Sequence, residues 1–112
     1  MKKTFFYFSF LLLILINLPS ETLDDAHSAL RRKDYTTAVR IYRTIAEESD
    51  AAAQFYLGYQ YQIGSGVPQD FKEAAKWYLL SAEQGIPGAQ SILGRFYEQG
   101  QGVLQSYRDA VK

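Results

Sequence analysis

A repeat of 36 residues constrains the fold of this 112-residue chain more than any other feature of its sequence. When residues 53–76 are placed over residues 89–112 without a gap, 11 of the 24 positions are identical. Ordinary residue usage gives only about one or two such matches by chance. A period of this length is typical of solenoids, in which each unit buries its apolar face against the next one.

The first half of each unit predicts a helix. Ala53, Leu57 and Tyr61 are spaced at i, i+4 and i+8, which places them on one side of a helix. Gly58 lies beside Leu57 and carries no side chain, so a second helix can approach closely there. The corresponding stripe of the next unit begins at Ala89.

A glycine-rich turn then leads into a second helix. Residues 64–68 read Gly-Ser-Gly-Val-Pro, where glycine favours the left-handed backbone of a helix end and proline cannot continue the helix. Asp70 is the predicted N-cap of the second helix. The predicted buried side of this helix consists of Phe71, Ala74, Ala75, Trp77, Tyr78 and Ala82.

A shorter unit precedes these two. Residues 22–32 and 34–48 predict a further helix pair, and its turn lacks the Gly-x-Gly insertion. The offset of 36 also relates Asp34 to Asp70 and Tyr42 to Tyr78. We therefore expect an all-α fold, an α/α solenoid of antiparallel helix pairs with about two and a half repeats.

The N-terminus has the pattern of a secretory signal peptide. Lys2 and Lys3 precede a run, residues 5–16, that is apolar except for Ser9. This run is shorter than the roughly 20 residues of a membrane-spanning helix. We expect residues 1–20 to be removed after Ser20 and the protein to be periplasmic or secreted. An uncleaved membrane anchor formed by residues 4–18 is the alternative.

Composition excludes several function classes. Twelve basic and 12 acidic residues give no net charge, which argues against nucleic-acid binding. The chain has no cysteine and one histidine, so thiol chemistry and two-histidine metal motifs are excluded. We expect His27 to be a surface residue paired with Asp24, one turn earlier. The sequence therefore predicts no metal and no cofactor.

The remaining polar motifs do not predict catalysis. The adjacent carboxylates of residues 24–25 and 47–48 cannot face each other across a cleft as glycosidase carboxylates do, and we expect residues 47–48 to be solvated. The Gly-x-Gly turns lack the Lys and Ser/Thr of a phosphate-binding loop. We therefore predict no catalytic residue and no enzymatic activity.

The repeat pattern of residues 52–112 resembles the SEL-one-like repeat (SLR), a relative of the tetratricopeptide repeat, while residues 21–52 are closer to a tetratricopeptide helix pair. The residues that carry the likeness are Ala53, Leu57, Gly58, Tyr61, Gly64, Gly66, Val67, Asp70, Ala74, Trp77, Tyr78, Ala82 and Gly85. The resemblance implies an α/α solenoid that holds protein complexes together, often in a bacterial envelope or at a host interface. Some secreted members with paired cysteines are linked to β-lactam or peptidoglycan-like ligands, a branch that this cysteine-free chain matches poorly.

Positions that differ between units are where repeat proteins place recognition. In the tetratricopeptide register, the inner groove of the first helices would be lined by Phe55, Tyr59, Gln62, Ser91, Arg95 and Glu98. Plain solvent-exposed surface is the alternative interpretation of these residues. The repeated aromatics are instead expected in the core, namely Tyr61, Trp77, Tyr78 and Tyr97.

Three hypotheses on function follow. The first is a non-catalytic module that binds a protein or peptide partner. The second is a binder of cell-wall glycan or β-lactam-type ligands, or a small hydrolase. The third is a truncated structural remnant, because the last predicted helix begins near Gln105 and has only about eight residues. The open C-terminal end of the solenoid would also allow self-association.

Overall fold

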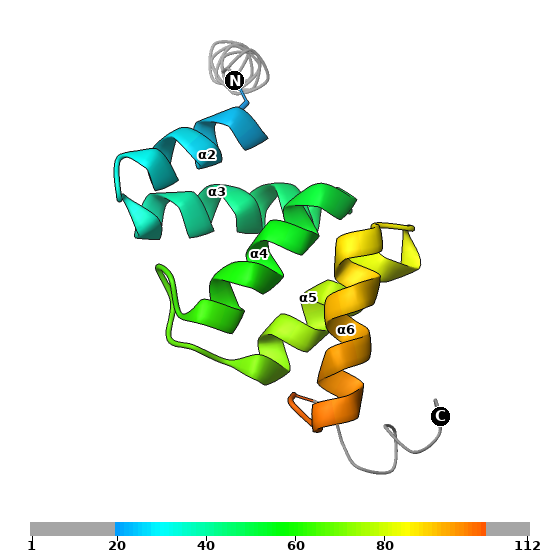
Figure 1. Ribbon diagram of the computed structural model, residues 1–112. Coiled ribbons are helices and arrows are strands. Elements are labelled where there is room, and N and C mark those ends of the chain that lie inside the picture. Colours follow the sequence, from blue (N-terminus) through cyan, green and yellow to red (C-terminus); the bar gives the residue numbers. More distant parts are fainter. Residues whose placement is uncertain (1–19, 103–112) are drawn as a thin grey trace, which may run out of the picture.

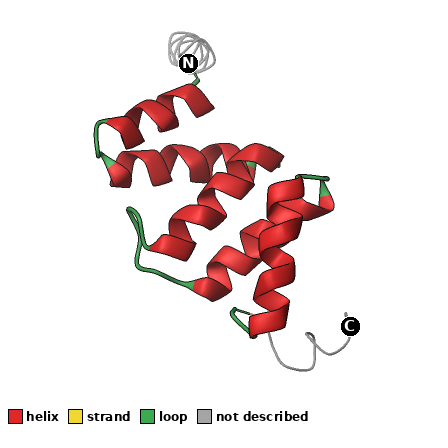
Figure 2. Cartoon of the chain, viewed as in Figure 1, coloured by secondary structure: helices red, strands yellow, loops and turns green. Residues whose placement is uncertain are grey.

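The computed structural model describes residues 20–102, which form an array of helices that follow one another from α2 to α6 (Figure 1). This part of the chain contains no strand (Figure 2). The helices are α2 (Leu23–Arg31), α3 (Tyr35–Glu47), α4 (Ala51–Ile63), α5 (Phe71–Glu83) and α6 (Pro87–Gln99). Each helix packs chiefly against its neighbour in sequence, which confirms the predicted solenoid of helix pairs. The predicted signal peptide, apart from Ser20, and the predicted helix from Gln105 lie outside the described residues.

Side-chain caps explain where most helices begin. Asp70 accepts hydrogen bonds from the backbone N–H groups of Lys72 and Glu73 at 3.0 and 3.1 Å, which confirms the predicted N-cap. Asp34 and Asp50 cap α3 and α4 in the same way. These carboxylates satisfy donors that the first turn of a helix leaves unpaired.

The glycine-rich turn after α4 depends on both of its glycines. Gly64 ends the helix with φ +73° and donates its N–H to the carbonyl oxygen of Gln60 at 2.9 Å. Gly66 has φ +76°, and a Cβ atom built there would lie only 2.3 Å from the carbonyl oxygen of Tyr35. The second glycine therefore lets the turn lie directly against the first residue of α3, which gives the Gly-x-Gly motif a packing role.

Two clusters of buried side chains form the core. The first joins α2, α3 and the N-terminal half of α4, and the second joins α5 and α6. Tyr61 packs against both clusters. Of the four predicted core aromatics, Tyr78 is fully buried, while Tyr61, Trp77 and Tyr97 are half-buried against the clusters.

A glutamine that is identical in both units has a structural role that the sequence analysis did not assign. Gln54 Nε2 donates to the carbonyl oxygen of Ala46 at 3.3 Å, and 36 residues later Gln90 Nε2 donates to the carbonyl oxygen of Ala82 at 3.1 Å. Gln84 Nε2 donates in turn to Gln54 Oε1 at 2.9 Å. These bonds tie each first helix to the end of the helix before it.

Gly58 brings α4 and α5 together, as expected. A Cβ atom at Gly58 would lie 3.0 Å from the ring of Tyr78 and 3.3 Å from the carbonyl oxygen of Ala74. At Gly94, the same position of the next unit, no described atom lies within 4 Å of such a Cβ.

These two glycines predict opposite responses to the same substitution. We expect Gly58→Ala to lower the free energy of unfolding by about 1–3 kcal/mol, because the added methyl group overpacks the helix contact. Gly94→Ala should leave it unchanged or raise it by up to about 1 kcal/mol, because alanine is the better helix former. Urea unfolding followed by circular dichroism measures both, and equal destabilisation of the two variants would contradict the packing argument.

Candidate partner-binding groove

An open hollow of about 350 Å³ lies along the first helices of the three pairs, α2, α4 and α6, with one residue from α3. Its lining carries no acidic side chain, no lysine and no arginine, and half of its residues are aromatic. We call it the aromatic groove, and it is lined by His27, Leu30, Tyr42, Phe55, Tyr56, Tyr59, Gln60 and Ile92.

Stacked rings form the α2 end of the aromatic groove. Tyr42 and Tyr56 stack with their ring centroids 5.5 Å apart, and His27 meets Tyr56 edge-on at 4.8 Å. His27 Nδ1 and Tyr42 Oη are joined by a hydrogen bond of 2.6 Å. The prediction that His27 is a surface residue paired with Asp24 is therefore wrong. The His27 ring is half-buried, and it reaches Tyr42 because α2 packs on α3.

Two of the six predicted groove residues line the aromatic groove. Tyr59 is 44% exposed and forms part of its surface. Phe55 is half-buried and reaches α6, since a Cβ atom built on Gly88 would lie 3.2 Å from its ring. The Phe55 ring thus helps to set the distance between α4 and α6.

The other four predicted residues lie outside this lining. Gln62 is half-buried, and its Oε1 accepts a hydrogen bond of 2.5 Å from the hydroxyl group of Tyr78. Burial raises the pKa of Tyr78, and the positive charge of Arg95 offsets only part of this rise. Three of the four are exposed on α6, namely Ser91, Arg95 and Glu98.

The sequence analysis missed most of the residues that line the aromatic groove. Three of them were detectable, because Tyr56 corresponds to Ile92 and Gln60 to Phe96 under the offset of 36, so these positions differ between units. Tyr42 gave no such signal, because the offset of 36 relates it to an identical residue, Tyr78. The missed residues are His27, Leu30, Tyr42, Tyr56, Gln60 and Ile92.

Burial of two tyrosines makes stability depend on alkaline pH. Burial raises the pKa of Tyr42 from 10.0 to about 12, and it raises the pKa of Tyr78 as well. The folded state therefore holds these protons more tightly than the unfolded state, so stability is kept below pH 10 and falls as pH rises toward 12.

We expect the melting temperature to fall steeply above about pH 10. Tyr42→Phe carries no titrating hydroxyl group, so the stability difference between this variant and the wild type should shrink or reverse over the same range. Thermal unfolding between pH 8 and pH 11.5 tests this, and a stability difference that does not change with pH would contradict it.

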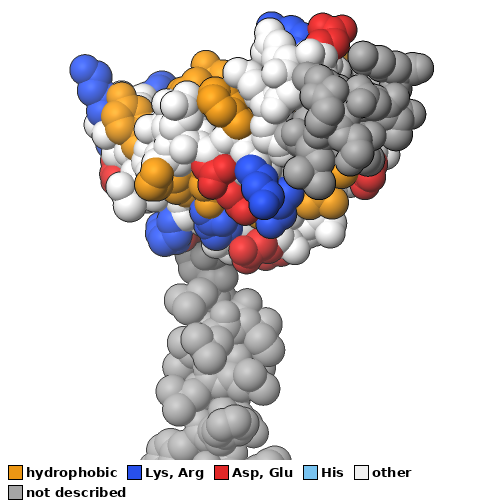
Figure 3. Space-filling model, turned by 90° about the horizontal axis from the view of Figure 1, so that it is seen from below, with side chains coloured by type: hydrophobic (Ala, Val, Ile, Leu, Met, Phe, Trp, Pro, Cys, Tyr) orange, Lys and Arg blue, Asp and Glu red, His pale blue; other side chains and the backbone are white. Residues whose placement is uncertain are grey.

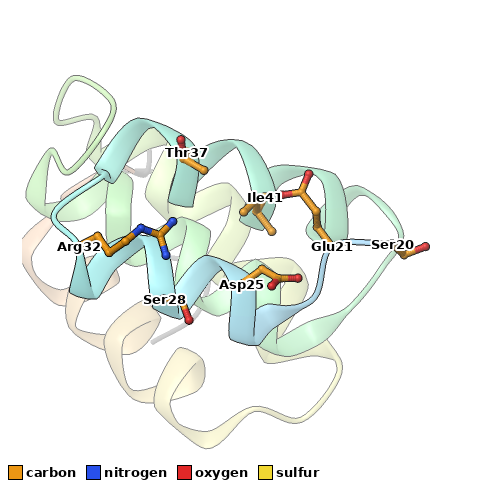
Figure 4. Close-up of a pocket in the computed structure, with 7 residues that line it drawn as sticks. All are labelled: Ser20, Glu21, Asp25, Ser28, Arg32, Thr37 and Ile41. Carbon is orange, nitrogen blue, oxygen red and sulfur yellow. The ribbon is translucent and has the colours of Figure 1, made fainter. Parts of the chain in front are cut away.

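A second hollow of about 350 Å³ lies between α2 and α3, and six of its seven lining residues are polar (Figure 4). Its carboxylates already have partners. Glu21 accepts two hydrogen bonds from Arg40, at 2.8 and 3.1 Å, which lower the pKa of Glu21. Asp25 accepts from the backbone N–H of Thr22 at 2.7 Å in the capping box of α2. Arg32 lies at the opposite end of the hollow from Glu21 (Figure 4). Asp25 therefore caps α2, and Glu21 joins the start of α2 to Arg40 on α3.

On the face seen in Figure 3, Lys and Arg side chains lie beside Asp and Glu side chains. No large patch of a single charge sign is seen on this face. Glu47 and Glu48 are exposed, as predicted. Within residues 20–102, no three His, Cys, Asp or Glu residues come close enough to hold a metal ion. No helix in the same range has the length and apolar character needed to cross a membrane.

The helix pairs of this chain repeat every 36 residues, and the aromatic groove lies along their first helices. This arrangement places the protein in the class of helical-repeat solenoids. Within this class the chain belongs to the Sel1 repeat family, because the family model matches residues 51–86 and 87–112. The resemblance seen in the sequence is thus confirmed. Sel1 repeats generally mediate protein–protein interactions.

Solved structures support the same assignment. The crystal structure of c5321, a protective antigen of uropathogenic Escherichia coli with an SLR fold, matches with 35% identity and a TM-score of 0.68. The match covers 73% of this chain and 18% of that one. A Sel1 repeat protein from Oxalobacter formigenes matches with 40% identity and a TM-score of 0.60, covering 62% and 20%. The chain thus spans about a fifth of each relative's length. No curated protein matches it.

Proposed function

We propose that this protein is an exported, non-catalytic interaction module that holds a protein or peptide partner in the aromatic groove. The observation that carries the proposal is the uncharged, aromatic lining contributed by α2, α4 and α6. Tyrosine side chains combine a large apolar area with a polar tip and are frequent anchors of protein interfaces. Tyr59, almost half exposed in this lining, is the residue best placed to contact a partner.

Crosslinking from defined positions tests where the partner lies. A photo-crosslinking residue at position 91, exposed on α6, is compared with one at position 72, exposed at the start of α5. We expect the full chain to capture one protein from position 91 and not from position 72. The same adduct should be lost when Tyr59→Ala and Arg95→Ala are combined.

Other results would replace the proposal. Equal capture from both positions, or capture unaffected when Tyr59→Ala and Arg95→Ala are combined, would remove the aromatic groove as the binding surface. Retention of peptidoglycan fragments or a labelled β-lactam that is lost in Tyr59→Ala would favour the ligand-binding alternative. Turnover of either compound would favour the hydrolase.

Export is proposed from the pattern of residues 1–20. Expression of the full chain in a bacterial host, followed by cell fractionation and intact mass measurement, tests it. A periplasmic or secreted product that begins at Glu21 is the expected result. An uncut product in the membrane fraction would favour the anchor of residues 4–18, and an uncut cytoplasmic product would contradict export.

A further inference from the structure

The bond whose cleavage would release the exported protein lies directly against the folded helices. The proposed export requires hydrolysis of the peptide bond between Ser20 and Glu21, and both residues are exposed. The first helix, α2, begins at Leu23, and the Leu23 side chain packs against the first buried cluster. Only Glu21 and Thr22 therefore separate the bond from the packed part of the chain.

Both of these residues are held by contacts within the folded chain. Glu21 accepts two hydrogen bonds from Arg40, and its side chain lies beside α3 (Figure 4). The N–H of Thr22 donates to Asp25 at 2.7 Å, and the carbonyl oxygen of Thr22 accepts from the N–H of Ala26 at 3.2 Å. Thr22 is the last extended residue before the helix, and both of its backbone polar groups are already bonded.

These contacts oppose what a peptidase needs. A protease binds the residues on both sides of the bond as an extended strand, and backbone N–H and C=O groups of such a strand pair with the enzyme. In the folded protein the groups of Thr22 are bonded to α2, and the packed helix begins at the next residue. The peptidase therefore reaches the bond only when the first turn of α2 opens, and the cleavage rate follows the population of this open form.

From these observations we propose that folding closes the cleavage site. A chain in which α2 packs on α3 before cleavage keeps residues 1–20 and stays attached to the membrane through residues 4–18. In a chain that is cut first, signal peptidase adds one water across the Ser20–Glu21 amide, which leaves a carboxylate on Ser20 and an ammonium group on Glu21. The order of folding and cleavage thus divides the protein between a released and an anchored form. This inference rests on the proposed export.

Cleavage of the full chain by purified bacterial signal peptidase tests this closure. The uncut chain is made by cell-free synthesis, folded in mild detergent and incubated with the peptidase, and intact mass identifies the product. We expect cleavage to be at least about tenfold faster when Gly-Ser-Gly-Ser is inserted between Glu21 and Thr22, because the bond then lies on a free linker. Leu57→Asp should speed cleavage as much, since a charge at this fully buried position unfolds the first cluster.

Two point variants test the individual contacts. Arg40→Gln removes the partner of Glu21 and should speed cleavage about two- to fivefold, the effect of an exposed ion pair. Asp25→Ala removes the capping box of α2 and should speed cleavage about threefold or more. Neither substitution changes Ser20 or Glu21. Lys72→Gln, at the exposed start of α5, is the charge control and should leave the rate unchanged.

Two outcomes would overturn the inference, and they differ in what they say about export. Equal rates for the wild type, the insertion variant and Leu57→Asp would reject the closure and leave the proposed export standing. Cleavage of none of these chains would reject the processing site and the closure together. Circular dichroism shows whether Arg40→Gln and Asp25→Ala keep their helices, and if either variant does not, the insertion variant decides.

Discussion

Tyr78→Ala should lower the free energy of unfolding by about 3–5 kcal/mol, the usual cost of truncating a buried aromatic side chain. The Tyr78 ring is fully buried and lies between Phe55 and Phe96, with centroids 5.8 and 5.7 Å away. It also fills the space over Gly58 on α4. Since small domains have only about 5–15 kcal/mol of stability in total, we expect α5 and α6 to lose their fixed packing on α4. Urea unfolding with parallel tyrosine fluorescence and circular dichroism measures the loss.

Tyr78→Phe is the matched control. This variant keeps the ring and removes only the hydroxyl group that donates to Gln62 Oε1. A loss of about 1 kcal/mol is expected, the ordinary net contribution of one hydrogen bond. If the Ala variant were no less stable than the Phe variant, packing of the ring would not be what joins these helices.

Gly66→Ala should cost about 3 kcal/mol or more, from two sources. A left-handed backbone is unfavourable for an L residue by about 1–2 kcal/mol, and φ here is +76°. The added Cβ would also lie 2.3 Å from the carbonyl oxygen of Tyr35 and 2.9 Å from a methyl group of Val39, so the turn must move away from α3. Overpacking of this kind costs about 1–3 kcal/mol. Thermal and urea unfolding should show the loss.

Gly85→Ala separates these two sources. Gly85 also has positive φ, +96°, but no described atom lies within 4 Å of a Cβ built on it. One unit earlier, Ser49 occupies the equivalent position with φ +71°, so an L residue is accommodated there. The expected cost is about 1 kcal/mol. Equal losses in the Gly66 and Gly85 variants would mean that the backbone conformation alone explains why glycine stands at position 66 and again at position 102.

The sequence predicted those parts of the fold that depend on the repeat. Gly58, Asp70 and Tyr78 were placed correctly because each acts through local geometry or through a contact with the adjacent helix of the same unit. Helix starts were less accurate, because α4 and α6 begin at Ala51 and Pro87, two residues before the repeat boundaries inferred from sequence identity. The residues that fix those starts lie outside the identical block: Asp50 caps α4, and Pro87 is the first residue of α6.

The site was predicted only in part, for physical reasons. Phe55 and Tyr59 could be identified because they differ between units, whereas the burial of His27 depends on a contact with Tyr42, fifteen residues away, and on how two helices cross. The spacing of residues in the sequence also does not show whether a buried glutamine side chain has a hydrogen-bond partner. Gln54 and Gln60 are both buried on α4, and only the structure shows that one carboxamide is satisfied and the other is not.

The packing of each helix chiefly on its neighbour in sequence has a consequence for how the chain acquires its structure. Short connections close at little entropic cost, so contacts of low sequence separation form quickly, on a scale of about microseconds to milliseconds for helical proteins. The ribosome adds only about 5–20 residues per second. The bundle of α2, α3 and α4, which has its own buried cluster, therefore has time to fold during synthesis and to serve as the template on which α5 and α6 assemble.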